Sequence, residues 1–552
     1  MLQARIGRFE AGPRRAVLAA AVYGQTFWQG AVAKLLGLAD QAPEVVAWLQ
    51  ALVDAELLEA HAASQIPGQW EYGFRHALVR DAAYGLLTES DRKVGHQLAA
   101  EFLEAVHQQV ASAVLAYHFR QAGALDKALQ HYLLAGDRCA AQSLDAEARV
   151  HYAAAAETLT LLADTPSRRR LHVDLLLKRV QSGMTSLSAE SQLSFLEEAR
   201  ALLESLAAPQ TAQPEDRLRL ARVDFYNARI LGYAGQPGRA MPYFQRVLPV
   251  AREFGDQELL TLSSIVIGMV ELAHGQMAQA RATWMPLLEI SEDFFGVTMD
   301  TARCLTYPIL ALSASGRFPA ATAALQRAQK WAQKTNQPAL IGGVLVIEGF
   351  GYLLAADWSA AIRASQETIA CAKQSGQVLQ AYSGLDTLAW AQSHSGLHAQ
   401  ALKTRAESAE LRRTLGRTLI EDWFEAAEAE ILFNAGRTDQ ALAKAQQVAA
   451  TAQQSRLLFA YAVAERVWGS ALARLGASLD EVAAHFSASL LTCEQTEQVC
   501  NAIQGHLCWG RALRERDAEA DAQQHFAQAL QLLAAGGYEK GLEWARGIAV
   551  AR

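Results

Sequence analysis

One spacing constrains this sequence more than any other feature. From about residue 215 onward, a turn-forming residue returns every 40 or 41 positions. These turns are placed at Gly235, Gly275, Gly316, Ala356, Gly396, Gly436, Gly476 and Asp517. Seven of the eight turns are followed five residues later by an alanine, at Ala240, Ala280, Ala321, Ala361, Ala401, Ala441 and Ala522. A period of this length predicts a repeated helix hairpin rather than several unrelated domains.

Two further positions support this prediction. Seven residues before each turn lies a small residue, except at Ile309; the small residues are Ala228, Gly268, Gly349, Ala389, Ala429, Gly469 and Gly510. Small side chains allow the two helices of a hairpin to approach closely. Nine residues after the turn, Phe244, Trp284 and Phe526 supply bulky side chains on the second helix.

This order of small residue, turn, alanine and aromatic residue resembles the tetratricopeptide repeat (TPR). The longer period is similar to the variant found in bacterial regulators related to the maltose activator. The resemblance covers about residues 215–552 and implies eight TPR-like repeats that form a superhelix. Because a single hairpin cannot bury both of its apolar faces, neighbouring hairpins must stack. We therefore predict an all-α fold whose main part is an α-solenoid with a period of about 40 residues.

The chain before residue 207 does not follow this period. Residues 96–206 predict irregular TPR-like helix pairs, one of which turns at Gly123 with Ala128 five residues later. The polar, proline-containing segment that begins at residue 207 predicts a linker to the regular repeats.

Residues 1–95 predict a small, degenerate winged-helix-like domain. Helical patterns cover about 13–23, 28–37 and 43–55, and a strand hairpin turns at Pro67-Gly68. The sequence of this region resembles the segment that follows the ATPase module in large bacterial signalling proteins of the STAND type. The residues that carry the resemblance are Gly24, Phe27, Trp28, Leu36, Gly37, Tyr72, Phe74, Arg75, His76, Leu78, Arg80, Tyr84, Arg92, His96 and Ala99.

The ATPase of those proteins has no counterpart in this sequence. A phosphate-binding loop needs a Gly-Lys pair, and this dipeptide does not occur. The sequence likewise lacks the H-E-x-x-H and G-x-S-x-G patterns. We therefore expect a non-enzymatic protein without a cofactor or a metal. It is either a split-off sensor half of such a system or a fragment of a larger ATPase.

Composition limits the cellular compartments and the classes of partner that suit this chain. The 50 basic and 57 acidic residues give a formal charge of −7, which offers no general attraction to nucleic acid or anionic lipid. Six cysteines without a C-x-x-C pair are typical of a reducing compartment. No apolar run is long enough for a membrane span, and the first residues do not form a signal peptide. The prediction is a cytoplasmic protein.

The winged-helix outline raises a DNA-binding alternative. Its third helix would enter the major groove, yet residues 41–61 contain no Lys or Arg and four acidic residues. We therefore expect a structural or interdomain role rather than DNA binding. Arg75, His76 and Arg80 are candidates for an interdomain docking surface, while Phe74, Leu78 and Tyr84 are expected to pack in the core.

The concave side of the superhelix is the main candidate binding surface. If the repeats align as hairpins, positions two, three, six, ten and thirteen residues before each turn line it. The candidates are Arg229, Tyr233, Arg303, Phe350, Leu354, Asp386, Trp390, His394, Trp423, Asn434, Arg466 and Arg474. Aromatic residues flanked by arginines suit an extended peptide or helix with an acidic end. Alternatively, a tightly wound superhelix buries the aromatic stripe against itself.

These features favour a regulatory or scaffold protein. Its TPR superhelix would bind a protein, peptide or effector and relay a signal to a partner, such as an ATPase or kinase encoded separately or upstream. The alternative is a transcription regulator with a DNA-binding winged helix and a TPR ligand-sensing domain.

Overall fold

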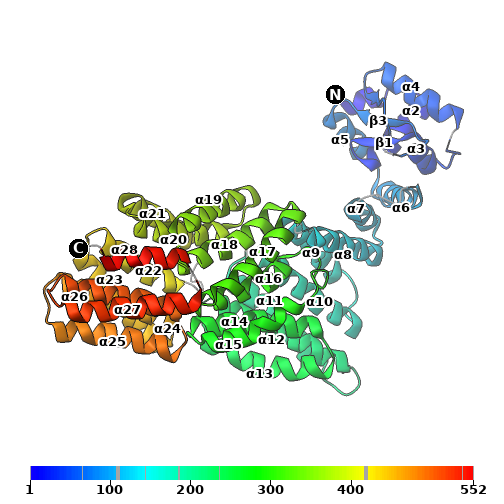
Figure 1. Ribbon diagram of the computed structural model, residues 1–552. Coiled ribbons are helices and arrows are strands. Elements are labelled where there is room, and N and C mark those ends of the chain that lie inside the picture. Colours follow the sequence, from blue (N-terminus) through cyan, green and yellow to red (C-terminus); the bar gives the residue numbers. More distant parts are fainter. Residues whose placement is uncertain are drawn as a thin grey trace. The chain divides into compact units, whose positions relative to one another are not determined.

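The computed structural model forms two compact units (Figure 1). Unit 1 is Met1–Gly183 with Ala201–Thr211, and unit 2 is Met184–Arg200 with Ala212–Arg552. Among the described residues, no helix has both the length and the apolar character needed to cross a membrane. The structure describes residues 2–40, 42–64, 66–106, 112–142, 144–184, 187–234, 236–415, 421–537 and 539–550.

Unit 1 begins with helices around a small sheet. These elements are α1 (Leu2–Ile6), α2 (Ala11–Tyr23), β1 (Thr26–Trp28), α3 (Gln29–Leu36), α4 (Pro43–Asp54), β2 (Leu58–Ala60), β3 (Glu71–Phe74) and α5 (Ala77–Gly85). The strands are antiparallel in the order β1-β3-β2, with Phe27 opposite Tyr72. The buried rings of Phe27 and Phe74 join Leu49 and Leu52 in one core. Strand β1 was not expected, because three residues are too few to display an alternating pattern.

Unit 1 continues with α6 (Glu89–Val106), α7 (Ser112–Ala122), α8 (Leu125–Ala141), α9 (Asp145–Thr160) and α10 (Pro166–Gly183). The expected hairpin between α7 and α8 is present, since Gly123 has a φ of 81° and Ala128 is fully buried. Two buried histidines meet where α6 packs on α7, with 2.8 Å between Nδ1 of His96 and Nδ1 of His118. Burial lowers the pKa of His96 to about 4 and that of His118 to about 3, so both are neutral at pH 7. Helix α11 (Ala189–Ser205) contributes residues to both units.

Unit 2 is an α-solenoid of TPR-like helix hairpins. The hairpins are α12 (Pro214–Tyr233) with α13 (Pro237–Glu253), α14 (Gln257–Ala273) with α15 (Met277–Trp284) and η1 (Met285–Glu289), α16 (Met299–Ala314) with α17 (Phe318–Thr335), α18 (Pro338–Leu354) with α19 (Trp358–Ser375), α20 (Val378–His394) with α21 (His398–Leu415), α22 (Glu421–Asn434) with α23 (Thr438–Ser455), α24 (Leu458–Arg474) with α25 (Leu479–Gln495), and α26 (Val499–Arg514) with α27 (Glu519–Gly536). Helix α28 (Glu539–Val550) follows them.

The expected turns end the first helix of each hairpin. Seven of the eight turn residues have a positive φ, between 58° and 84°; Gly235 lies outside the described residues. A left-handed residue at this position stops the helix and satisfies its last carbonyl groups, which explains the preference for glycine. Ala356 and Asp517 adopt the same conformation with φ values of 58° and 61°.

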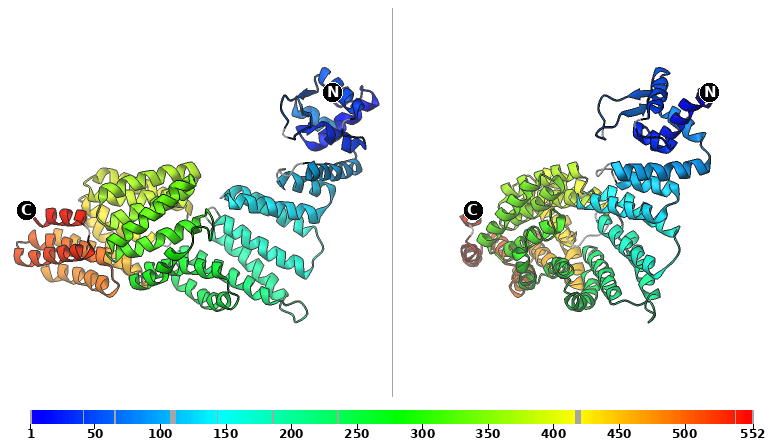
Figure 2. Two further views of the ribbon diagram at one scale, coloured as in Figure 1. Left: turned by 45° about the vertical axis from the view of Figure 1, so that its right-hand side comes forward. Right: turned by 90° about the vertical axis from the view of Figure 1, so that its right-hand side faces the viewer.

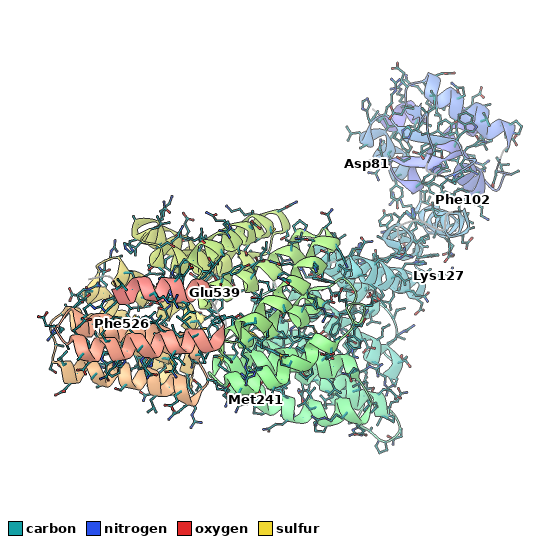
Figure 3. The ribbon with its side chains drawn as sticks, viewed as in Figure 1. Asp81, Phe102, Lys127, Met241, Phe526 and Glu539 are labelled. Atoms are coloured by element: carbon teal, nitrogen blue, oxygen red, sulfur yellow. The ribbon has the colours of Figure 1, made fainter. Side chains whose placement is uncertain are left out.

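Two small residues of the repeat lie against bulky side chains of the second helix. A Cβ atom at Gly268 would lie 2.2 Å from Nε1 of Trp284, and one at Gly510 would lie 2.6 Å from Cε1 of Phe526. Figure 3 labels Phe526, whose ring also contacts the guanidinium of Arg514 at 4.4 Å. These two hairpins therefore pack closely because a small and a large residue are paired across each of them.

The superhelix contacts itself after one turn. A Cβ atom at Gly275 would lie 2.8 Å from Cβ of Leu458, and one at Gly316 would lie 2.8 Å from Cγ1 of Val499. The ammonium group of Lys540 forms an ion pair with Asp357 at 2.8 Å. The residue numbers differ by 183 in each of these three pairs. Figure 2 shows the hairpins in chain order from green to red, with the last ones returning beside the earlier green helices.

Candidate functional site

A cavity of about 280 Å³ lies on the inner side of unit 2. It is bounded by α11 and by the first helices of six consecutive hairpins, from α12 to α22. All of its lining residues belong to unit 2. They include Met184, Gln192, Ile230, Tyr233, Met269, Leu272, Met299, Arg303, Tyr307, Val346, Phe350, Gln380, Ser383, Thr387 and Trp423. First helices supply this lining because the second helix of each hairpin lies on the outer side of the superhelix.

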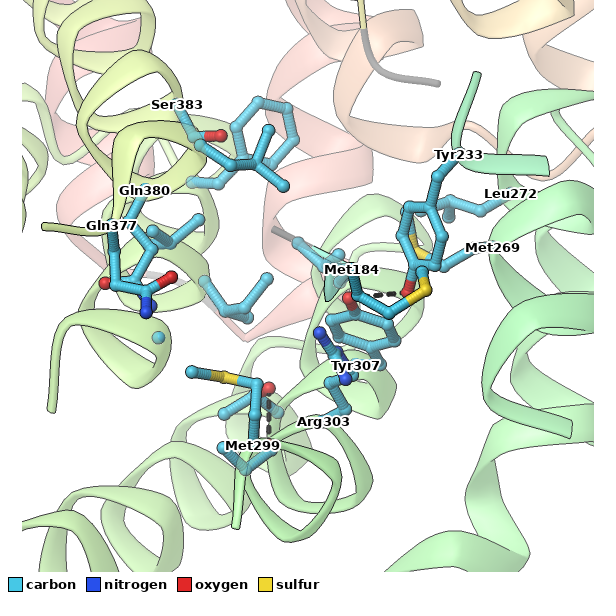
Figure 4. A pocket seen from close by; sticks show the side chains of 18 of the residues that line it. Met184, Tyr233, Met269, Leu272, Met299, Arg303, Tyr307, Gln377, Gln380 and Ser383 are labelled. Atoms are coloured by element: carbon cyan, nitrogen blue, oxygen red, sulfur yellow. Dashed lines mark hydrogen bonds between the residues drawn. The ribbon is translucent and has the colours of Figure 1, made fainter. Parts of the chain in front are cut away.

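Most of the wall is apolar, and its polar groups are few. The hydroxyl groups of Tyr233 and Tyr307 face each other at 3.4 Å, and Arg303 lies beside Tyr307 (Figure 4). Burial raises the pKa of Tyr307, so its hydroxyl group keeps its proton at pH 7. Gln380 donates its amide hydrogen to the carbonyl group of Ala339 at 2.9 Å, which leaves its oxygen without a partner.

A charged cluster lies behind this wall. Arg303 donates a hydrogen bond to Asp300, and Arg229 pairs with the same carboxylate oxygen at 3.5 Å. Burial acts to raise the pKa of Asp300, but Arg229 and Arg303 hold it below its usual value. The carboxylate is therefore ionised at neutral pH and is shared by two guanidinium groups.

The sequence-predicted groove residues fall into two groups. Four of them line the cavity, namely Tyr233, Arg303, Phe350 and Trp423. Two of these, Phe350 and Trp423, have stacked rings with centroids 5.5 Å apart. Both side chains are largely buried, so the aromatic stripe is partly packed against itself and partly turned toward the cavity.

The other predicted residues have partners within the chain. Arg229 belongs to the charged cluster, Asp386 accepts from Arg405 at 2.6 Å, Asn434 donates to Ser393 at 2.9 Å, and Arg474 donates to the carbonyl group of Phe433 at 2.8 Å. Leu354 packs beside Phe318 and Cys500 where the superhelix meets itself.

Three of them form a buried network around Glu430. The indole of Trp390 donates to Glu430 at 2.8 Å, His394 lies 3.5 Å from the same oxygen, and Arg466 binds both carboxylate oxygens. Burial acts to raise the pKa of Glu430, but Arg466 and His394 hold it well below its usual value. This part of the inner side is therefore filled by residues that satisfy one another.

Sequence reasoning missed several residues of the cavity. Tyr307, Met299 and Met184 are among them. Leu310 and Thr306 do occupy positions six and ten before the turn at Gly316, so the repeat alignment could have found these two. Met184 lies before the regular repeats, where no periodic signal exists.

The predicted docking residues lie at the start of α5. Arg75 and His76 are exposed, with Arg75 at 3.5 Å from Glu56, and Arg80 pairs with Asp81 at 2.8 Å. Leu78 was expected in the core, but it is 70% exposed. The prediction for Leu78 was wrong because Val79 and Ala83, not Leu78, lie on the face of α5 that packs on the sheet domain.

No family profile matches this sequence. Among curated proteins, an uncharacterised protein of Rhizobium meliloti (strain 1021) is 26% identical over 143 residues, which are 24% of this chain and 14% of that protein. The chain thus covers a small part of that relative's length.

Solved structures share the helical architecture at low identity. The STAND protein with a tetratricopeptide repeat sensor from Pyrococcus horikoshii aligns with 99% of this chain and 66% of its own, at 11% identity and a TM-score of 0.34. The Cut9–Hcn1 structure of the APC/C aligns with 83% of this chain and 91% of its own, at 14% identity and a TM-score of 0.45. The Rap protein complexed with Competence and Sporulation Factor aligns with 70% of this chain and 97% of its own, at 10% identity and a TM-score of 0.36.

Proposed function

We propose that this chain is a non-enzymatic regulatory protein that binds an effector inside its TPR-like superhelix and relays the bound state to a partner. The supporting observation is the cavity itself, because six consecutive hairpins contribute to its wall. A concave, mostly apolar pocket with a few polar groups is the usual form of a small-molecule site. Its volume of about 280 Å³ favours a small effector or a single side chain over a whole helix.

The relay follows from the contacts between distant repeats. A ligand that touches six hairpins at once restricts their movement relative to one another. The contacts at Gly275, Gly316 and Asp357 join the same hairpins to helices 183 residues later. A change in curvature at the cavity therefore alters these contacts, and a partner that binds one form of the superhelix is sensitive to the ligand.

The partner surface is proposed to include Arg75, His76 and Arg80. Two of these side chains are exposed, and the neighbouring Leu78 presents an apolar group to solvent. A mixed basic and apolar surface suits a protein partner such as a separately encoded ATPase or kinase.

The effector site can be tested with a neutral apolar dye. N-phenyl-1-naphthylamine fluoresces in apolar pockets and carries no charge, so it reports the cavity without requiring Arg303. We expect saturable binding by the full chain. Val346→Trp, which fills the cavity, should abolish binding, whereas Val150→Trp on the 66% exposed Val150 should not. Equal binding by both variants would place the dye elsewhere and contradict the proposal.

Hydrogen–deuterium exchange tests the relay. Dye binding should slow exchange at the starts of α24 and α26, which contact Gly275 and Gly316. Protection confined to the cavity wall would show binding without relay. Hydrolysis of ATP by the purified chain would contradict the non-enzymatic assignment.

The second candidate function is DNA-binding transcription regulation. The helices α2, α3 and α4 with the three-stranded antiparallel sheet favour it, because three helices and such a sheet are the elements of a winged helix, although α1 and α5 are present as well. Helix α4 opposes it, since the helix carries Glu44 and Asp54 and no basic residue. A salt-dependent mobility shift on upstream DNA would establish this alternative over the first.

A further inference from the structure

The charge of the cavity wall is unbalanced. Arg303 is the only charged residue among the described residues that line the cavity. Its carboxylate partner, Asp300, is already shared with Arg229. Within the described parts of the chain, no second carboxylate forms an ion pair with either arginine. Two guanidinium groups and one carboxylate leave one positive charge without a partner.

That positive charge is largely removed from water. Arg229 is 5% exposed, and the side chain of Arg303 is 17% exposed. A buried charge is costly unless an opposite charge or several hydrogen bonds compensate it. Because Arg303 is the member of the cluster that reaches the cavity, an anion there would provide the missing partner.

The rest of the cavity wall favours a ligand whose remaining part is apolar. Thioethers of Met269 and Met299 and the rings of Phe350 and Trp423 face the cavity, and flexible methionines adapt to irregular apolar ligands. The nearby amide groups are neutral. Gln380, 9% exposed and with a free amide oxygen, can accept a donor on the ligand. No Asp or Glu is found among the described lining residues to repel an anion.

Size separates a small molecule from a peptide. The cavity of about 280 Å³ lies near the lower end of the volumes typical of ligand pockets, about 300–1,000 Å³. Several extended residues of a peptide need more room than this. A carboxylate that reaches Arg303 therefore belongs to a molecule small enough to lie within the cavity.

We infer that the effector is a small apolar carboxylic acid. Its carboxylate pairs with the guanidinium group of Arg303, and its hydrocarbon or aromatic body lies between the methionines and the Phe350–Trp423 stack. This inference rests on the proposed function, since it names the chemical class of ligand for the same cavity.

The test compares three probes of one chain length. Decanoate, 1-decanol and decylammonium are used to displace N-phenyl-1-naphthylamine from the full chain. We expect decanoate to displace the dye at a concentration roughly tenfold or more below that of 1-decanol, because a charged hydrogen bond to arginine is strong in a dry site. Decylammonium should be the weakest of the three, because its charge is repelled by Arg303.

A matched pair of variants assigns the preference to the cavity. In Arg303→Met, decanoate should lose its advantage over 1-decanol while 1-decanol is unchanged. In Arg317→Met, which replaces an exposed arginine at the start of α17, all three probes should behave as in the wild type. Far-UV circular dichroism and thermal melting confirm that both variants are folded.

The outcomes separate this inference from the function on which it rests. Equal displacement by all three probes would overturn the carboxylate assignment and leave the apolar site intact. Displacement by a short peptide with an apolar C-terminal residue, but not by decanoate, would overturn the small-molecule assignment. Failure of the dye itself to bind would contradict the proposed function as well.

Discussion

The two halves of the superhelix differ in what occupies the same repeat positions. In α12 to α18, the inner positions hold Tyr233, Arg303 and Phe350, which line most of a cavity that α20 and α22 complete. In α20 to α26, inner positions hold residues such as Trp390 and Arg466, which are joined through Glu430. The backbone hairpins are alike in both halves. The difference shows that a repeat position fixes the direction of a side chain, while its neighbours decide whether it is available to a ligand.

The largest loss of stability is expected from a substitution in α20 to α26, the half whose inner side is filled by the network around Glu430. Arg466→Met leaves the carboxylate of Glu430 buried without its main partner, and removing one member of a buried ion pair costs about 3–5 kcal/mol. Urea unfolding of unit 2, followed by tryptophan fluorescence, measures this loss. A loss below about 1 kcal/mol would show that Trp390 and His394 alone satisfy the carboxylate and would remove the contrast between the halves.

The second prediction concerns what both halves share. Gly268→Ala and Gly510→Ala each force a Cβ into the facing Trp284 or Phe526, and overpacking of this kind costs about 1–3 kcal/mol. Similar losses at the two sites, measured by chemical denaturation, would confirm that hairpin packing is the same in both halves. Gly547→Ala is the control, because its added Cβ meets no atom within 4 Å.

A third prediction extends the comparison to unit 1, where the two buried histidines that meet between α6 and α7 are neutral rather than charged. Unfolded histidine has a pKa of about 6.5, whereas His96 and His118 have pKa values of about 4 and 3 in the folded chain. From pH 7 to pH 4 the unfolded state binds more protons, so the free energy of unfolding falls as the pH falls. This stabilisation is complete above the unfolded pKa and decreases progressively toward pH 4.

At pH 5 the expected loss is about 2 kcal/mol for each of these two histidines. In unit 2, burial likewise lowers the pKa of His506 to about 4, so α26 is expected to lose stability in the same pH range. Hydrogen–deuterium exchange at pH 7 and pH 5, corrected for intrinsic rates, measures it in α6 and α7. The variant His118→Phe, which keeps an aromatic ring and removes one titrating group, should reduce the pH dependence. Unchanged protection of α6 at pH 5 would contradict the prediction.

The smallest change in stability is expected from the corresponding arginine-to-methionine substitution in α12 to α18, the half whose inner residues line the cavity. Arg303→Met leaves Asp300 paired with Arg229, so the remaining charges are balanced. We expect a change in stability within about 1 kcal/mol, because the lost interaction is offset by removal of a buried positive charge. A loss as large as that of Arg466→Met, in the same unfolding assay, would show that the two halves are held together in the same way.

Much of the fold could be predicted because its determinants are local. A residue in the left-handed conformation ends a helix, and a small residue seven positions earlier allows the second helix to pack closely. Gly268, Gly275 and Trp284 therefore predict their hairpin from positions that lie within one repeat. Strand β1 escaped prediction because it depends on pairing with β3, more than forty residues away. Of the cavity, Tyr233 and Arg303 were accessible through the repeat alignment.

The sequence by itself determined the period, the turns and which face of each first helix points inward, because these depend on spacings shorter than one repeat. The tertiary structure decided which inner residues remain open and which are satisfied. The indole of Trp390 is hydrogen-bonded to Glu430, which lies 40 residues later. The superhelix contacts itself through Asp357 and Lys540, which are 183 residues apart. Contacts at such separations arise only after the hairpins have stacked, since each depends on the summed rotation of all the repeats between them.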